Sequence, residues 1–494
     1  MRFRRVIRLI PAAFMVVGIA SAAGASVPTA AGWTQYQGGP QHTGFDPAAP
    51  APPLASRWQI ATGIGDETHL AGLPAPVIDG PDAIIVDRED VTAIDIATGT
   101  MSWTLPRELG PSAPAAVADG DGGRTVVLYT EGGGDRSPSA SGSPTAVPTP
   151  SGGGTAGTTD AHSTLVAIDA SSRHELWRRA LTGVSTTGPT VDGGLAVVGA
   201  DDGTVTAVEV SSGDVRWHQD LGDVVDTPIA ADAGVVYVSV RSDSRQPPSV
   251  VALQEADGAE VWRYAPSTSG LVAGAPTAVG GTVYLALSDG TVRAVGADTG
   301  LERWASRLNT VAAGGAPAVS DDAVIVVDTR GEVYRLDPAT GARGWDFALN
   351  TPVYGPAVIT GSDVLIADGS GELSALDPAT GDRIWRQGLG VGPLLTIAIA
   401  PDAVVVARTG TSAGLVGLAA DPNGVLIDEQ SPTIVKPGSL ALDWAIAAIP
   451  LVVILTLAGR FLIARLGPPD LEHEDISAAV GASPDTWEDD EDPT

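Results

Sequence analysis

Few residues in this sequence have the types and spacing needed for catalysis. Residues 410–414 read Gly-Thr-Ser-Ala-Gly and match the G-x-S-x-G motif of serine hydrolases, which requires a strand-to-helix turn. Strand-like runs flank these residues on both sides, so we expect a hairpin turn here. The six histidines show no metal-ligand spacing and form no H-E-x-x-H motif. Aspartate-rich turns such as Asp201-Asp202-Gly203 lack the ligand series of a calcium-binding loop.

The absence of cysteine and the rarity of lysine exclude several further kinds of catalytic and metal site. The chain has no cysteine, which excludes disulfides, thiolate metal sites, thiol nucleophiles and a lipid-modified N-terminal cysteine. Lys436 is the one lysine, and it lies in a predicted linker, which excludes Schiff-base and P-loop chemistry. We therefore predict no catalytic, cofactor-binding or metal-binding residues.

The net charge narrows the class of partner. A formal charge of −31 argues against nucleic acid, because binding phosphates requires a basic surface. It argues equally against anionic lipid headgroups and favours cationic partners.

The elements that must position any site come from a repeat. Gly stands four residues before Trp in six of seven copies of one phrase, whose most regular examples are LDPATGARGW (residues 336–345) and LDPATGDRIW (residues 376–385). Asp in this phrase can bond its own turn, Gly can end the turn with a left-handed backbone, and Trp is suited to wedging between sheets. We assign a structural role to these repeat residues: Trp58, Trp103, Trp177, Trp217, Trp262, Trp304, Trp345, Trp385, Asp95, Asp169, Asp337, Asp377, Gly99, Gly213, Gly258, Gly300, Gly341 and Gly381.

The segments between the tryptophans predict four short strands in each unit of about 42 residues, which is a β-propeller blade. The fold class is therefore all-β, an eight-bladed propeller of four-stranded blades, with seven blades as the alternative. We expect the segment around Arg57-Trp58-Gln59 to supply the last strand of the eighth blade, because ring closure hides the edges of the sheets. Residues 425–429 (VLIDE) compete for that position.

The phrase A-x-D-x-x-T-G-x-x-x-W resembles the repeat of pyrroloquinoline-quinone (PQQ) type propellers, and residues 33–44 (WTQYQGGPQHTG) resemble the segment that leads into the same fold. The resemblance covers residues 33–429. Enzymes of this group hold PQQ against a vicinal disulfide ring, with Ca²⁺ bound by Glu, Asn and Asp. This chain has no cysteine, and its three asparagines (309, 350, 423) suggest no such set, so nothing in the sequence supports bound PQQ or Ca²⁺. The likeness is closer to the non-enzymatic branch, which includes proteins of the BamB type and extracellular sensor propellers.

The two ends of the chain predict its topology. Residues 1–25 have the basic, apolar and small-residue regions of a signal peptide. Residues 442–466 are apolar enough for a transmembrane helix, and arginines on its C-terminal side place the tail in the cytoplasm.

The predicted organisation is a signal peptide (1–25), an N-terminal segment (26–57), a propeller (58–429), a linker (430–441), the membrane helix and an acidic, disordered tail (467–494). A low-complexity insertion occupies residues 132–160 within the second blade. The predicted location is the cell membrane, with a single span and the propeller outside the cytoplasm.

These observations predict a non-catalytic binding or scaffold propeller for a protein or cell-envelope ligand. One alternative is a PQQ-dependent quinoprotein oxidoreductase. Another is an extracellular ligand sensor that signals through the acidic tail.

Overall fold

The computed structural model describes residues 32–61, 75–133, 162–241, 247–266, 272, 274–308, 315–409 and 413–427. Contacts divide the chain into Met1–Pro432 and Thr433–Thr494, and every described residue belongs to the first unit. The predicted signal peptide, linker, membrane helix and tail lie outside the described residues. Among the residues that are described, no helix has the length and apolarity to cross a membrane.

The described chain forms eight antiparallel sheets of four strands, one of them extended by the short strand β1 (Phe45–Asp46). The first four blades contain these strands: β3 (Val77–Asp79), β4 (Asp82–Val86), β5 (Asp90–Asp95) and β6 (Met101–Pro106); β7 (Ala116–Gly120), β8 (Arg124–Gly132), β9 (Ser163–Asp169) and β10 (Glu175–Ala180); β11 (Thr190–Asp192), β12 (Leu195–Gly199), β13 (Thr204–Glu209) and β14 (Val215–Asp220); and β15 (Ala230–Asp232), β16 (Val235–Val240), β17 (Ser249–Gln254) and β18 (Glu260–Tyr264).

The other four blades contain these strands: β19 (Thr277–Val279), β20 (Thr282–Ala286), β21 (Thr291–Gly296) and β22 (Glu302–Arg307); β23 (Ala318–Val319), β24 (Val324–Val327), β25 (Glu332–Leu336) and β26 (Arg343–Ala348); β27 (Val358–Thr360), β28 (Val364–Ala367), β29 (Glu372–Leu376) and β30 (Arg383–Gly388); and β31 (Leu394–Ala400), β32 (Ala403–Arg408), β33 (Gly414–Ala420) and β2 (Leu54–Ala61). A single-turn 3-10 helix, η1 (Asp121–Gly123), joins β7 to β8.

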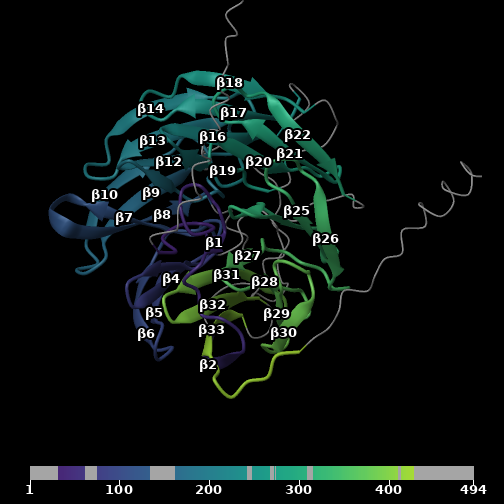
Figure 1. Ribbon diagram of the computed structural model, residues 1–494. Helices are drawn as coiled ribbons and strands as arrows, with labels where there is room; N and C mark the ends of the chain where they lie inside the picture. Colours follow the sequence, from purple (N-terminus) through teal and green to yellow (C-terminus); the bar gives the residue numbers. More distant parts are fainter. Residues whose placement is uncertain are drawn as a thin grey trace, which may run out of the picture. The chain divides into compact units, whose positions relative to one another are not determined.

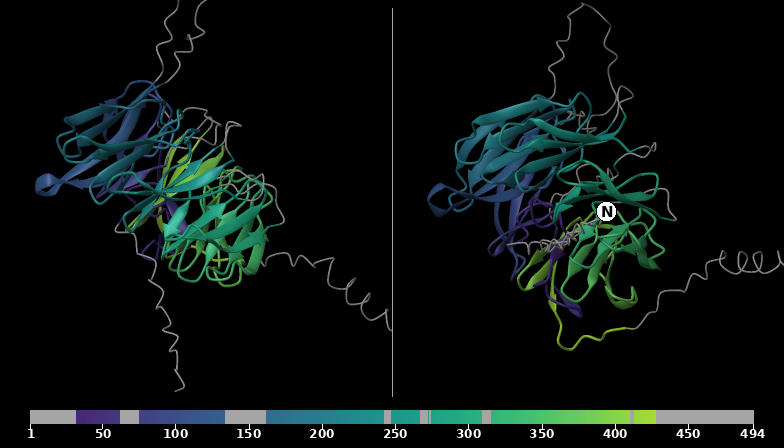
Figure 2. Two further views of the ribbon diagram at one scale, coloured as in Figure 1. Left: turned by 90° about the horizontal axis from the view of Figure 1, so that it is seen from above. Right: turned by 45° about the horizontal axis from the view of Figure 1, so that its top comes forward.

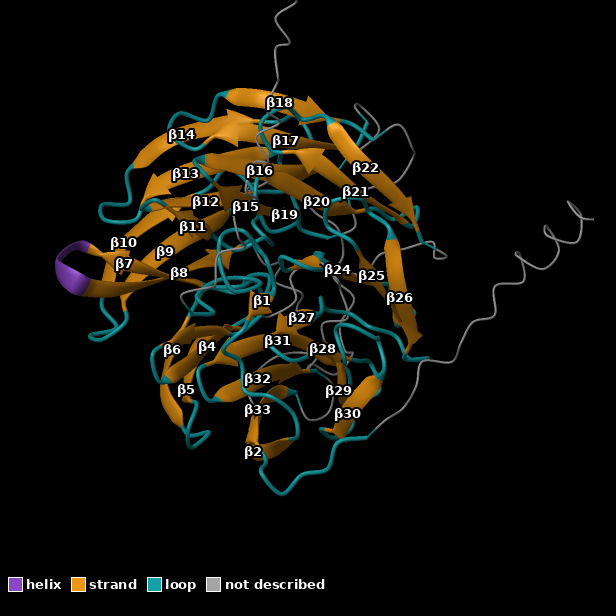
Figure 3. Cartoon of the chain, in the orientation of Figure 1, coloured by secondary structure: helices purple, strands orange, loops and turns teal. Residues whose placement is uncertain are grey.

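The blades follow one another around a ring (Figure 1). The first strand of each blade contacts the first strand of the next from β3 to β27, and β31 of blade 8 contacts both β28 and β3. The predicted all-β, eight-bladed propeller is confirmed, and the seven-bladed alternative is wrong. Figure 3 shows how little of the described chain is helical.

The ring closes with a strand from the beginning of the chain. β2 pairs antiparallel with β33, and Trp58 lies opposite Gly417. Residues 425–427, which competed for this position, instead approach blade 7, where the N–H of Ile427 donates to the carbonyl of Ile384 at 2.7 Å. The closure predicted around Trp58 is therefore the one the chain adopts, and it leaves no unpaired edge on β33.

Burial explains why inner and outer strands differ in sequence. Inner strands such as β12 (LAVVG) and β20 (TVYLA) are buried along their whole length, because neighbouring blades cover both of their faces. Outer strands such as β14 (VRWHQD) alternate between exposed and buried residues. The core is accordingly divided into apolar clusters that lie between consecutive sheets.

Every blade has a register irregularity between its third and fourth strands, next to the repeat tryptophan. In six blades an alanine of the third strand lies directly opposite the tryptophan, as Ala93 does for Trp103. A bulge adds one residue to a strand and turns its side chains. Here the bulge lies beside the tryptophan whose indole extends from its own sheet toward the next one.

Candidate functional site

The repeat tryptophans connect neighbouring blades. In six blades the indole N–H donates across the junction to a carbonyl in the next blade, at 2.6–3.0 Å. We call this arrangement the Trp clasp. The donor and acceptor pairs are Trp58 with Ile96, Trp177 with Val210, Trp217 with Glu255, Trp262 with Ala297, Trp304 with Pro338, and Trp345 with Pro378.

The glycines of the repeat complete the Trp clasp. Gly99, Gly213, Gly258, Gly300, Gly341 and Gly381 all have positive φ. A Cβ atom added to any of them would lie within 3.0 Å of the indole that reaches over from the preceding blade. Glycine therefore adopts the positive φ of the turn without strain and leaves space for the close approach of the ring.

The repeat aspartates are bound within their own turns. The carboxylate of Asp337 accepts hydrogen bonds from the N–H and hydroxyl of Thr340, and these hold its pKa below the usual range. Asp95 is held in the same way by Thr98, and Asp377 accepts from the backbone of Ala379 and Thr380. Asp169 accepts from Ser171 and Ser172 and pairs with Arg124 at 3.0 Å, and its pKa is strongly lowered. All four carboxylates stabilise turns, and the lowered pKa values of Asp95, Asp169 and Asp337 keep these three ionised, which suits no acid–base role.

Residues 33–46, which we call the hub segment, lie against the innermost strands of the ring. Its backbone carbonyls accept hydrogen bonds of 2.7–3.0 Å from inner-strand N–H groups of blades 1, 2, 4, 5, 6 and 7. Blade 3 is bound by a side chain instead: the amide of Gln35 donates a hydrogen bond to the carbonyl of Val191 and accepts one from its N–H. The six accepting carbonyls belong to Trp33, Thr34, Pro40, Gln41, Thr43 and Gly44.

Two residues of the hub segment combine burial with strained backbone. Gln37 and His42 have φ values of 55° and 58°, which is uncommon for residues other than glycine. His42 is fully buried; its Nδ1 lies 3.2 Å from the carbonyl oxygen of Pro276, and its ring meets that of Tyr36 edge-on at 5.1 Å. Burial lowers the pKa of His42 to about 4 and raises that of Tyr36. The imidazole is therefore neutral, and the hub is a buried polar contact of the chain with itself.

The residues of a quinoprotein site do not come together in the described part of the chain. There, no group of three His, Cys, Asp or Glu side chains could hold a metal ion. Asn350 and Asn423 lie in exposed turns, and Asn309 falls outside the described residues. The described residues therefore do not fit bound PQQ with its calcium ion. The G-x-S-x-G sequence connects β32 to β33, whose terminal residues Arg408 and Gly414 are paired, so the motif spans a hairpin although Ser412 itself is not described.

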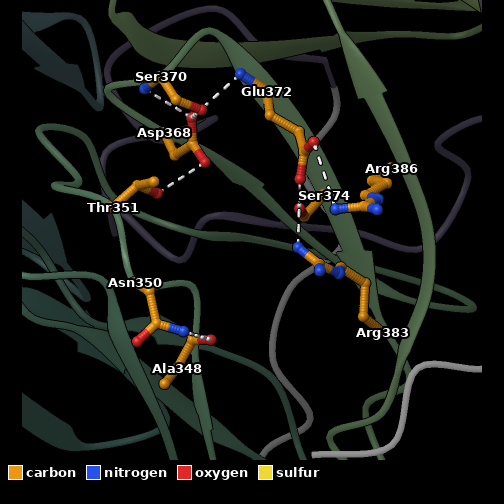
Figure 4. A network of polar contacts seen from close by, with 9 residues as sticks. All are labelled: Ala348, Asn350, Thr351, Asp368, Ser370, Glu372, Ser374, Arg383 and Arg386. Carbon is orange, nitrogen blue, oxygen red and sulfur yellow. Dashed lines mark hydrogen bonds and ion pairs between the residues drawn. The ribbon is translucent and has the colours of Figure 1, made fainter.

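A network of polar contacts connects blades 6 and 7 (Figure 4). The buried carboxylate of Asp368 accepts from the N–H of Ser370 and Glu372 and from the hydroxyl of Thr351. Glu372 pairs with Arg383 at 3.2 Å and with Arg386 at 3.8 Å. Because the polar groups drawn there satisfy one another, the network has a structural role.

A groove between the same two blades is open to a ligand. It has a volume of about 710 Å³, within the range of about 300–1,000 Å³ typical of binding pockets. Its residues come from β1, from the first hairpins of blades 6 and 7, and from their repeat turns. They are Phe45, Pro47, Ser320, Asp321, Asp322, Ala323, Arg335, Asp337, Pro338, Ala339, Ile359, Thr360, Gly361, Val364, Pro378 and Ala379.

Charge and apolar surface are combined in this groove, which we call the 6/7 groove. Asp321 and Asp322 are exposed, Asp337 is half-buried, and Arg335 donates to the backbone carbonyl of Asp322 at 2.7 Å. The accessible apolar surface comes from Phe45, which is half-buried, and Pro47, which is exposed. The composition of the whole chain predicted an acidic surface, but no sequence motif identified this groove, because blade 6 supplies its charges and the groove forms only where β1 and blade 7 pack beside them.

The sequence matches the model of one protein family, described as outer membrane protein assembly factor BamB, over residues 87–224, 201–352 and 329–427. No functionally curated protein matches the sequence.

Among solved structures, BamB from Moraxella catarrhalis is 19% identical, with a TM-score of 0.53 over 74% of this chain and 100% of that one. A europium-containing methanol dehydrogenase is 14% identical, with a TM-score of 0.54 over 76% of this chain and 89% of that one. A quinohemoprotein alcohol dehydrogenase from Pseudomonas putida is 14% identical, with a TM-score of 0.58 over 82% of each chain. At these identities the structures share the fold, which serves both scaffold proteins and enzymes. The three family matches together cover more than half of the sequence, and the chain therefore belongs to the family described as outer membrane protein assembly factor BamB.

Proposed function

We propose that this protein is a non-catalytic scaffold propeller that binds a basic segment of a partner protein in the 6/7 groove. The family match supports a role in protein binding, since BamB is an assembly factor. The hub segment supports a non-catalytic role. Its histidine, His42, is buried and neutral and packs within the chain's own N-terminal segment.

The charge of the 6/7 groove is the observation that carries the proposal. Three aspartates and one arginine, all from blade 6, line it, and Arg335 is held by a backbone carbonyl. A cationic peptide gains from these carboxylates, while its apolar side chains can pack against Phe45 and Pro47. The excess of acidic residues over the whole chain extends the same attraction to longer range.

We further propose that the propeller lies outside the cytoplasm and is tethered by residues 442–466. The sequence of the two ends supports this topology, because a signal peptide followed by a stop-transfer helix orients the chain in one direction.

Photo-crosslinking in living cells tests the groove in the full-length chain. A photoreactive residue at Ala339 or Ala379, both exposed in the groove, should yield one discrete crosslinked partner. Replacing Asp321 and Asp322 by arginine should abolish that product. The control replaces Asp257 and Asp298 by arginine. These are exposed aspartates in the repeat turns of blades 4 and 5, and the crosslinked product should remain. Equal loss in both double variants would contradict the assignment to this groove.

Two further measurements test the rest of the proposal. Purified full-length protein supplied with PQQ and Ca²⁺ should show no dye-linked oxidation of alcohols or sugars, and clear turnover would overturn the non-catalytic assignment. Protease added to intact cells should remove the propeller and spare the C-terminal tail. A protected propeller would show that the orientation is reversed.

A further inference from the structure

One repeat turn departs from the others at the glycine position. In blade 2 the phrase reads IDASSRHELW, so Arg173 stands where six other copies have glycine. Its backbone still forms the turn, with φ of 60° and a hydrogen bond of 2.7 Å from its N–H to the carbonyl of Asp169. The backbone of the turn is therefore kept, while a large side chain replaces a hydrogen atom.

That side chain is incompatible with the Trp clasp. At the six glycines a Cβ atom would lie within 3.0 Å of the preceding blade's indole, a separation that the ring and the turn cannot maintain. The indole that faces Arg173 is Trp103 of blade 1. Within the described part of the chain Trp103 donates to no carbonyl of blade 2, in contrast to the six clasped tryptophans.

A groove lies at this junction, with a volume of about 380 Å³. We call it the 1/2 groove. It is lined by Asp79, Pro81, Asp82, Ser102, Trp103, Gly123, Arg124, Thr125, Ala170, Ser171 and Arg173.

The connection between β7 and β8 forms part of the same groove. In blade 3 the corresponding connection has only two residues between Asp192 and Leu195, but in blade 2 it includes η1, which projects from the ring in Figures 2 and 3. Gly122 and Gly123 have positive φ, as Gly193 and Gly194 do in blade 3, so the departure lies in the extra residue and the 3-10 turn and not in the backbone conformation of the glycines. Two departures from the repeat therefore meet at one junction, and both contribute to the shape of the groove.

The charges in the 1/2 groove balance. Asp79 and Asp82 come from blade 1, and Arg124 and Arg173 come from blade 2. Arg124 is paired with Asp169 at 3.0 Å, and Asp82 accepts a hydrogen bond of 2.5 Å from the hydroxyl of Ser102. Two carboxylates would repel a phosphate or carboxylate ligand, and two guanidinium groups would repel a cation. A neutral ligand fits this arrangement best.

We propose that the 1/2 groove binds a carbohydrate, one or two rings at the end of an oligosaccharide. A pyranose has a face of C–H groups that can pack against the indole of Trp103, and hydroxyls around its edge. Carboxylates accept hydrogen bonds from those hydroxyls, and the guanidinium of Arg173 donates to them. The volume is near the lower end of the range for ligand pockets, which suits one or two rings. The proposal is independent of the partner in the 6/7 groove.

The test measures binding of maltotriose, cellotriose, chitotriose and mannotriose to the purified full-length protein. Saturation-transfer NMR and tryptophan fluorescence should detect at least one of these probes with a Kd of about 0.1–10 mM. Arg173→Gly restores the glycine of the repeat and should close the groove, weakening binding at least about tenfold. The melting temperature should stay the same or rise, because glycine relieves the strain at positive φ.

His174→Ala is the matched control, since His174 is exposed in the same turn but does not line the groove. It should bind like the natural protein. Trp103→Leu is a second variant that keeps an apolar side chain and should lose binding, with folding monitored by circular dichroism. The proposal is overturned if no trisaccharide binds, or if Arg173→Gly binds as tightly as the natural protein.

Discussion

At the scale of single residues, the contact between glycine and tryptophan is what makes neighbouring blades fit. The glycine has two separate tasks, since it allows positive φ and leaves space for an indole. The chain contains positions that separate these tasks. Gly341 has φ of 70° and faces Trp304, whereas Gly122 has φ of 73° and nothing within 4 Å of its missing Cβ.

We expect Gly341→Ala to destabilise the protein more than Gly122→Ala. Both changes place a Cβ at positive φ, which costs about 1–2 kcal/mol. Gly341→Ala also pushes against the indole ring and should lower the free energy of unfolding by a further 1–3 kcal/mol, roughly the cost of overpacking. Denaturant unfolding of both variants measures the difference, and equal losses would show that the ring moves aside freely.

His42 should make stability depend on pH. Its folded-state pKa is about 4, below the ordinary value of 6.5, so between these values the unfolded chain binds a proton that the folded chain does not. The free energy of unfolding should therefore fall as pH drops through this range, by at most about 3 kcal/mol from this residue.

His42→Asn tests this dependence, because asparagine tolerates positive φ and takes up no proton. Urea unfolding at about pH 7 and about pH 4.5 should show a smaller loss of stability for this variant than for the natural protein. His218→Asn changes an exposed histidine and should leave the loss unaltered. An identical loss in all three proteins would mean that His42 is protonated in the folded state as readily as in the unfolded one.

At the scale of elements, the connections between strands are where a blade can change in length. The long insertion interrupts the connection between β8 and β9, and the flanking residues Gly132 and Ser163 are directly paired. Gly133 follows with φ of 78°, a conformation suited to a tight hairpin.

Deleting residues 134–161 should therefore leave the fold intact. The deletion joins Gly133 to His162 and creates a two-residue hairpin, and shortening a connection from about 30 residues to two lowers the entropic cost of closing it by roughly 2 kcal/mol. Thermal unfolding followed by circular dichroism checks this. Removing Gly133 as well is the control, because a one-residue connection cannot close the pair and should destabilise blade 2. A large loss from the first deletion would show that the insertion packs on the propeller.

At the scale of the whole molecule, closure depends on the beginning of the chain. The hub segment bonds to the inner strands of seven blades, and β2 completes the eighth. We expect a chain that starts at Gly32 to unfold cooperatively at an unchanged temperature. A chain that starts after Ala61 should lose cooperative unfolding and aggregate, because it exposes the edge of β33.

A third truncation separates the two contributions. A chain that starts at Pro47 lacks the hub segment but retains β2, and should melt at an intermediate temperature. Calorimetry and size-exclusion chromatography compare the three. A chain without β2 that still melted like the full propeller would show that ring closure contributes nothing to stability.

The number and type of blades could be predicted because the repeat is local. Trp, Gly and Asp recur at a spacing of about 42 residues, and each turn uses bonds within a few positions, as between Asp337 and Thr340. Even the closing strand was predictable, because Trp58 lacks strands before it and an open ring would leave edges unpaired.

Only the tertiary structure decided where groups from distant parts of the chain meet. The path of residues 33–46 along the hub depends on bonds to partners as far away as Ile359, and no periodic pattern encodes them. The same is true of residues 425–427, which approach Ile384 and do not complete blade 8. Arg173 was visible in the sequence as a missing glycine, but the groove beside it exists only because Trp103, seventy positions earlier, reaches the same junction. Local bonding specifies a blade, whereas sites between blades depend on the packing of whole sheets.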